Sequence, residues 1–171
     1  MILLLYVDDL FLTGEDNPIN ECKKKLATKF EMKDLGMMHY FLGLEVWRYP
    51  DEIFLNQGKY TVEILKRFGM LDCKAINISM VTNLKLLNDD SSERVDVTLY
   101  RQIIGSLMYL TNTRTYICSI VNTLCQYMME PQHVHIVATK HLMRYLKGTL
   151  DCGLIYIAES EFRLCGYTNS D

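Results

Sequence analysis

The sequence lacks any apolar run long enough to cross a membrane. Its opening run, MILLLYV, ends at Asp8, and no later run approaches the ~20 residues that a membrane-spanning helix needs. The opening run also lacks the basic start and the small-residue cleavage site of a signal peptide. We therefore expect an intracellular protein, in the cytoplasm or the nucleus, with no signal peptide and no membrane partner.

The six cysteines lack a pattern that would indicate a metal site. No C-x-x-C pair is present, and no histidine stands near a cysteine at ligand spacing. Scattered cysteines of this kind are usually buried thiols in a reducing compartment. This interpretation is favoured over a metal site or a set of disulfides.

The chain also lacks the excess of positive charge that is typical of a dedicated nucleic-acid binder. Its net charge is −3, and the first 90 residues hold 11 basic and 14 acidic side chains. Any surface for a polyanion must therefore be local. One block, residues 99–150, is net positive: it contains Glu130 against Arg101, Arg114, Lys140, Arg144 and Lys147.

What is present is an ordinary globular composition. The 171 residues are 49% hydrophobic and 23% charged, with no internal repeat, so the chain can bury a core as one domain or as two small ones. The patterns predict an α+β fold. The expected helices are at 15–30, 58–70, 99–113, 117–129 and 135–148, and the expected strands are at 2–7, 10–13, 39–47, 53–55, 153–158 and 162–167.

Two adjacent carboxylates, Asp8 and Asp9, interrupt the apolar stretch LLLYVDDLFLTG. Asp-Asp is a poor strand pair and a good turn pair, so we expect a tight hairpin with both carboxylates at its tip. Hard oxygen ligands in this position suit Mg²⁺, which takes one or two carboxylates together with waters and substrate phosphates. The alternative is a solvent-exposed turn at the end of a sheet, and the spacing alone leaves both open.

The residues Tyr6-Val7-Asp8-Asp9 resemble the Y-x-D-D box of reverse transcriptases. Further stretches resemble, in order, successive blocks of copia-type retrotransposon Pol polyproteins. These stretches cover nearly the whole chain, and their order is much more specific than the four-residue box. They are LLLYVDDLFLTG, KDLGMMHYFLGLEV, FLNQGKYTVEILKRFGMLDCK, YRQIIGSLMYLTNTR and HLMRYLKGTLDCGLIY.

The resemblance implies a role for each matching residue. Asp8 would bind the catalytic Mg²⁺ or Mn²⁺ ions, and Asp9 would be its less directly engaged partner. Tyr6 and Val7 would lie near the primer end, and Leu42-Gly43, in a hairpin like the primer grip, would approach the primer backbone. The helix from residue 99 would lie along the template–primer duplex, with a close approach at Gly105 and Ser106. The implied phosphate contacts are Arg101, Arg114, Arg144 and Lys147.

Three departures from the family pattern argue against activity of the chain alone. The family's polymerase site needs a third carboxylate on a strand well upstream of Y-x-D-D, and its fingers and first palm strands also precede that box. We expect this chain to lack all of these parts. The family's RNase H module opens with Y-[ST]-D-[AS]-D-W, whereas Asn169 stands here in place of the first Asp. The family's R-P-D-[IL] reads R-T-Y-I at 114–117.

We therefore expect the C-terminal half of a copia-type reverse transcriptase, inactive alone and without RNase H activity. The expected parts are a partial palm at 1–80, a linker at 81–98, a helical thumb and connection at 99–150, and a strand pair that opens an RNase H-like module at 151–171. Two alternatives remain. One is a non-catalytic nucleic-acid-binding module, and the other is an interaction protein or a subunit that completes a site with a palm fragment supplied in trans.

Overall fold

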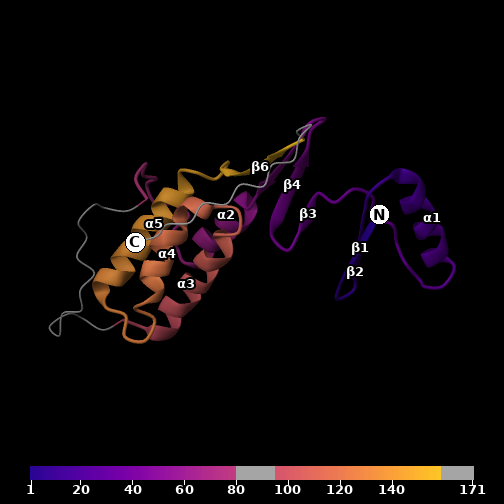
Figure 1. The fold of residues 1–171 in the computed structure, drawn as a ribbon. Coiled ribbons are helices and arrows are strands. Elements are labelled where there is room, and N and C mark those ends of the chain that lie inside the picture. The colour runs from indigo at the N-terminus through magenta and orange to yellow at the C-terminus, as the bar shows by residue number, and fades with distance from the viewer. Residues whose placement is uncertain (80–94, 159–171) are drawn as a thin grey trace, which may run out of the picture. The chain divides into compact units, whose positions relative to one another are not determined.

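The computed structural model describes residues 1–79 and 95–158. Its contacts fall into two compact units, residues 1–38 and 39–171. Helices and antiparallel strands are mixed in it, which confirms an α+β fragment (Figure 1). The expected division into a partial palm, a linker, a helical thumb and an RNase H-like start, with boundaries at residues 80, 98 and 150, describes functional parts. The division into compact units does not test it, and it stays a prediction. No helix within the described ranges is long and apolar enough to span a bilayer.

The first unit is a hairpin followed by one helix. Strand β1 (Ile2–Tyr6) pairs antiparallel with β2 (Asp9–Thr13), which confirms the expected hairpin. Helix α1 (Asp16–Ala27), with Glu15 as its N-cap, lies within the expected range 15–30. No residue of α1 is buried. One helix and two strands hold too little apolar surface to build a closed core.

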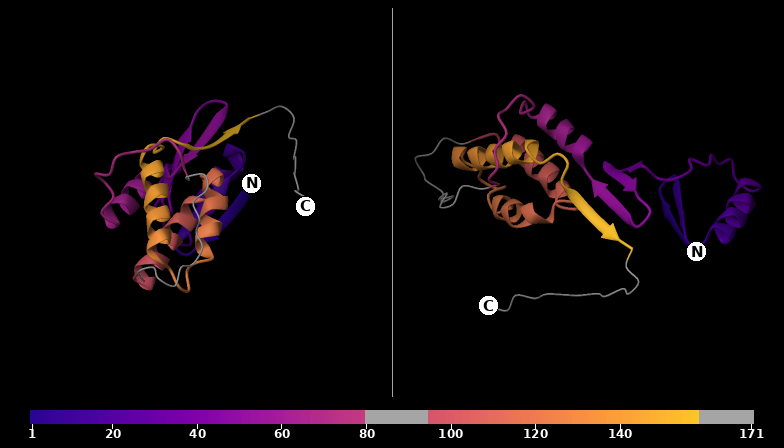
Figure 2. Two further views of the ribbon diagram at one scale, coloured as in Figure 1. Left: turned by 90° about the vertical axis from the view of Figure 1, so that its left-hand side faces the viewer. Right: turned by 90° about the horizontal axis from the view of Figure 1, so that it is seen from above.

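The second unit contains a four-stranded antiparallel sheet in the order β3-β4-β5-β6. The run 39–47, expected as one strand, is two strands, β3 (Tyr40–Phe41) and β4 (Leu44–Arg48), joined by a two-residue turn. Strand β5 (Glu52–Asn56) pairs with β4 on one side and with the distant β6 (Gly153–Ile157) on the other (Figure 2). The strand expected at 162–167 lies outside the described residues.

The helices of the second unit confirm the expected series. They are α2 (Gly58–Arg67), α3 (Val97–Leu110), α4 (Cys118–Cys125) and α5 (His133–Lys147), with a short 3₁₀ helix η1 (Thr115–Ile117) before α4. Asp96 caps α3 by accepting hydrogen bonds from the backbone N–H groups of Thr98 and Leu99. The helix therefore begins within the expected 81–98 linker. Residues 80–94 lie outside the described part of the chain.

The four helices share one apolar core. The helical spacing of 58–70 predicts Val62, Leu65 and Phe68 on the inward face. Leu65 is buried and Phe68 packs against the core, whereas Val62 is 36% exposed and its neighbour Ile64 is buried. Fully buried residues of α3, η1, α4 and α5 complete this core: Tyr100, Ile104, Leu107, Leu110, Ile117, Val121, Leu124 and Leu142.

Candidate nucleic-acid interface and carboxylate hairpin

The carboxylates of Asp8 and Asp9 lie at the tip of the first hairpin. The register pairs Tyr6 with Asp9, so Val7 and Asp8 form the turn. Both aspartates are exposed. Val7 has a φ of 51°, a left-handed conformation that is costly for a β-branched side chain. The tip therefore stores backbone strain next to two carboxylates, a combination often seen at functional sites.

The hairpin tip fits part of a divalent-metal site. Two exposed carboxylates are enough protein ligands for one hard cation whose other ligands are waters and phosphate oxygens. Two-metal phosphoryl transfer needs both ions clamped about 3.5–4 Å apart, which requires further bridging ligands. In residues 1–79 and 95–158, no three His, Cys, Asp or Glu residues gather as a metal-binding group.

The turn at Leu42 and Gly43 joins β3 to β4. Phe41 pairs with Leu44 across it, and both turn residues have positive φ, 48° at Leu42 and 78° at Gly43. Positive φ at both central positions matches the twist of a two-residue hairpin. The Leu42 side chain is 48% exposed. The family resemblance predicted a hairpin here, but the position of its turn was not predicted.

Two of the expected contact residues lie on an exposed face of α3. Arg101 and Gly105 are exposed and are four positions apart, hence on one side of the helix. A Cβ placed on Gly105 would meet nothing within 4 Å, so a ligand can approach the backbone there. Arg101 donates from Nε to the carbonyl oxygen of Met128 at 3.0 Å. Ser106, expected beside Gly105, is instead buried and donates to the carbonyl oxygen of Gln102.

Arg114 is a correction to the expected phosphate contacts, because its side chain is completely buried. Its Nη atoms donate to the carbonyl oxygens of Thr149 and Leu150 and to the hydroxyl of Tyr116. A phosphate contact requires an accessible guanidinium. Arg114 instead ties the end of α3 to the segment between α5 and β6.

Arg144 and Lys147 are partly accessible on α5 and are held by backbone carbonyls. Arg144 donates from Nε to Lys74 at 2.8 Å, and Lys147 donates from Nζ to Cys73 at 2.6 Å. A third α5 side chain, His141, lies 2.9 Å from the carbonyl oxygen of Ile78. These contacts use the Nε–H of Arg144 and one of the three N–H donors of Lys147. The remaining donors of both cations are suited to binding an anion.

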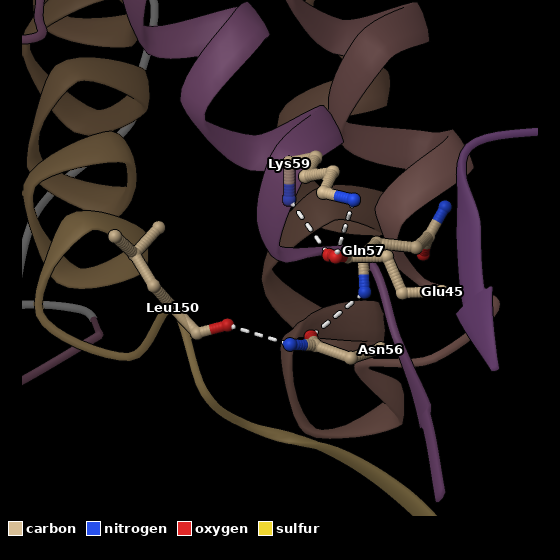
Figure 3. Close-up of polar contacts among 5 residues, drawn as sticks. All are labelled: Glu45, Asn56, Gln57, Lys59 and Leu150. Atoms are coloured by element: carbon tan, nitrogen blue, oxygen red, sulfur yellow. Dashed lines mark hydrogen bonds and ion pairs between the residues drawn. The ribbon is translucent and has the colours of Figure 1, made fainter. Parts of the chain in front are cut away.

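A polar network that sequence reasoning missed lies where β5 meets α2 (Figure 3). Asn56 donates to the carbonyl oxygen of Leu150 at 3.1 Å and accepts from the backbone N–H of Gln57. The buried Glu45 accepts from the backbone N–H of Lys59, 3.0 Å away, and its other oxygen lies 3.5 Å from Lys59 Nζ. A carboxylate at the start of a helix is favourable for the helix dipole. Glu45 within the apolar run FLGLEVW was the available signal for this network.

The comparisons with known proteins place the chain among retrotransposon sequences. Residues 1–82 match the family described as reverse transcriptase (RNA-dependent DNA polymerase). An uncharacterized mitochondrial protein of Arabidopsis thaliana is 42% identical over the whole chain. The retrovirus-related Pol polyprotein from transposon RE2 of A. thaliana is 38% identical over 99% of the chain, and that from transposon TNT 1-94 of Nicotiana tabacum is 34% identical over all of it. No solved structure matches the chain.

The relatives differ greatly in length. The chain spans 71% of the mitochondrial protein but only 12% and 14% of the two Pol polyproteins. It therefore corresponds to a small section of those polyproteins.

Proposed function

The chain belongs to the reverse transcriptase family of copia-like retrotransposon Pol polyproteins, and from this membership we propose that it is the primer-holding section of an RNA-directed DNA polymerase. The observation that carries the proposal is the exposed Asp8–Asp9 hairpin tip within the matched residues 1–82. In this role Asp8 and Asp9 supply carboxylates to the divalent-metal site. The Leu42–Gly43 turn and the exposed face of α3 hold the template–primer duplex.

Asp8 is the residue we assign to the metal ions, and Asp9 supports it. The bound Mg²⁺ or Mn²⁺ would supply charge stabilisation at the transferring phosphate. The residues of this chain bind and orient the ion. Asp8 stands in the turn itself, and Asp9 begins β2 opposite Tyr6, so strand pairing fixes the backbone beneath the second carboxylate.

Phosphate contacts are assigned to the cations that the structure leaves accessible. Arg101 lies on the exposed face of α3, and Arg144 and Lys147 lie on α5. Lys140 is also exposed on α5, one turn before Arg144. Such contacts give affinity that depends on salt and not on base sequence. Arg114 is excluded from this set because it is buried.

The proposed section does not polymerise by itself. Asp8 and Asp9 form no larger metal-binding group within residues 1–79 and 95–158. In-line phosphoryl transfer depends on positioning both ions and the nucleotide together, and two carboxylates cannot achieve this. A palm fragment that brings a third carboxylate in trans would complete the site.

The test combines duplex binding with primer extension by the purified full chain. We expect template–primer binding whose affinity falls steeply between 50 and 200 mM salt, and no extension with Mg²⁺ or Mn²⁺. Co-expression with a palm segment from a related polyprotein should restore extension, and Asp8→Asn should abolish the restored activity. Binding that does not respond to salt would overturn the proposed interface. Extension by the chain alone, lost in Asp8→Asn, would overturn its inactivity.

A further inference from the structure

Tyr109, near the end of α3, contacts the turn that joins β3 to β4, and we propose that it is a positioning residue. Its role would be to fix the Leu42–Gly43 turn to α3, so that the turn and the helix engage the primer end as one rigid unit. This inference rests on the proposed function, but the contact itself can be tested separately.

The first observation is a hydrogen bond between elements far apart in the sequence. The hydroxyl of Tyr109 donates to the backbone carbonyl oxygen of Leu42, 67 residues earlier. A carbonyl at the tip of a two-residue turn would otherwise be bound by water alone. The bond therefore attaches the tip of the hairpin to the helix.

The second observation is the close approach of Gly43 to an aromatic pair. The rings of Tyr60 and Tyr109 meet edge to face, with centroids 5.0 Å apart. A Cβ on Gly43 would lie 3.4 Å from the ring of Tyr109 and 3.7 Å from Tyr60. The turn thus sits directly on this pair, and the positive φ of Gly43 makes a larger residue unfavourable there.

The third observation is that the backbone beneath Tyr109 is itself held in place. The side-chain amide of the buried Gln57 donates to the carbonyl oxygen of Tyr109 at 3.4 Å and accepts from Thr113 at 2.7 Å. Gln57 immediately precedes α2. The end of α3, the start of α2 and the hairpin turn are therefore connected through Tyr109 and Gln57.

The test uses the full chain and compares Tyr109→Phe with Tyr156→Phe. The first substitution removes the hydroxyl and keeps the ring that packs on Tyr60. The second removes a hydroxyl from an exposed side chain of the same sheet. Hydrogen exchange of residues 40–46 should accelerate about threefold to tenfold in Tyr109→Phe, the change expected for one net hydrogen bond. Exchange within α3, and exchange in the control, should stay unchanged.

A second readout examines the nucleic acid. The ratio of affinities for a recessed primer end and for a continuous duplex of equal length should fall at least threefold in Tyr109→Phe. The affinity for continuous duplex should stay within twofold, which a general loss of structure would not allow. Gly43→Ala, which disturbs the same contact from the turn, should lower the same ratio.

The possible outcomes separate the two proposals. Unchanged exchange at residues 40–46 in Tyr109→Phe would overturn the positioning role. Faster exchange with an unchanged affinity ratio would also overturn it, because the turn would then not position the primer. A wild-type chain that binds recessed and continuous duplexes equally would contradict the proposed function. The exchange experiment would still show whether Tyr109 holds the turn.

Discussion

Arg114 donates a hydrogen bond from Nη2 to the carbonyl oxygen of Leu150, 36 positions further along the chain, at 3.1 Å. The same guanidinium reaches the carbonyl oxygen of Thr149, and no ion pair joins it to a carboxylate in the described residues. The buried cation is therefore stabilised by the dipoles of carbonyl and hydroxyl groups. Its Nε atom has no hydrogen-bond partner among residues 1–79 and 95–158. Such a group is costly to bury, so the contacts that it does make must be important for the fold.

Arg114→Met should destabilise the second unit strongly. The substitution leaves the carbonyl oxygens of Thr149 and Leu150 without their donor, and we expect a loss of about 2–4 kcal/mol in the free energy of unfolding. A urea melt measures it. The matched control is Arg101→Met on exposed α3, which should change stability by about 0.5 kcal/mol or less and weaken duplex binding. Equal stability losses in the two variants would contradict the structural role of Arg114.

Arg144→Gln should reduce the salt dependence of duplex binding. If its Nη groups contact one phosphate, the negative slope of log K against log salt should become shallower by about 0.9. Binding measured at four salt concentrations provides this slope. Lys66→Gln, which replaces an exposed cation near the end of α2, is the control and should leave the slope unchanged. An unchanged slope in Arg144→Gln would mean that Arg144 only holds the segment at Lys74.

The sequence predicted local features well and burial poorly. Asp8 and Asp9 could be assigned to a hairpin tip because turn chemistry depends on neighbouring residues. Arg114 could not be assigned to the interior, because its partners, Thr149 and Leu150, come from a distant segment. An arginine in a basic block is usually exposed, and nothing in its own neighbourhood indicated otherwise.

The Leu42–Gly43 turn shows an intermediate case. A hairpin here was expected only from the family resemblance, because the continuous apolar run 39–47 otherwise indicates a single strand. The contact with Tyr109 was not predictable, because residue 109 appears in the sequence only as one aromatic of an apolar helix. The candidate metal ligands were identified by their adjacency and by the family resemblance. The cations proposed to bind the duplex had to be distinguished by their exposure in the structure.

Val7→Asn should stabilise the first hairpin. Asn tolerates the left-handed φ of 51° much better than a β-branched residue, and the difference is about 1 kcal/mol. We expect slower hydrogen exchange in residues 2–13 by about fivefold, since 1.4 kcal/mol corresponds to tenfold. Val7→Ile keeps the β-branch and is the control that should show no slowing. Faster exchange in Val7→Asn would mean that the Val7 side chain makes a favourable contact that outweighs the strain.

The stability of the second unit should fall at alkaline pH. Burial raises the pKa of the Tyr100 hydroxyl, which donates to the carbonyl oxygen of Leu124 at 2.8 Å. Burial also raises the pKa of the Cys125 thiol and of Tyr145. In the unfolded chain these groups lose their protons near their ordinary values, about 8.5 for cysteine and about 10 for tyrosine. Above those values the folded state binds more protons than the unfolded state, so stability falls as pH rises.

Tyr100→Phe identifies the main contributor to this fall. We expect urea melts of the wild type to show constant stability up to about pH 8 and a steepening loss above about pH 10. Tyr100→Phe should be less stable at pH 7 by about 1 kcal/mol, because the bond to Leu124 is lost. Its decline above pH 10 should be shallower, since the variant has one fewer buried hydroxyl to deprotonate. Tyr156→Phe, on the exposed face of β6, should follow the wild-type curve at every pH. If Tyr100→Phe declines as steeply as the wild type, the alkaline loss arises from Cys125 and Tyr145 instead.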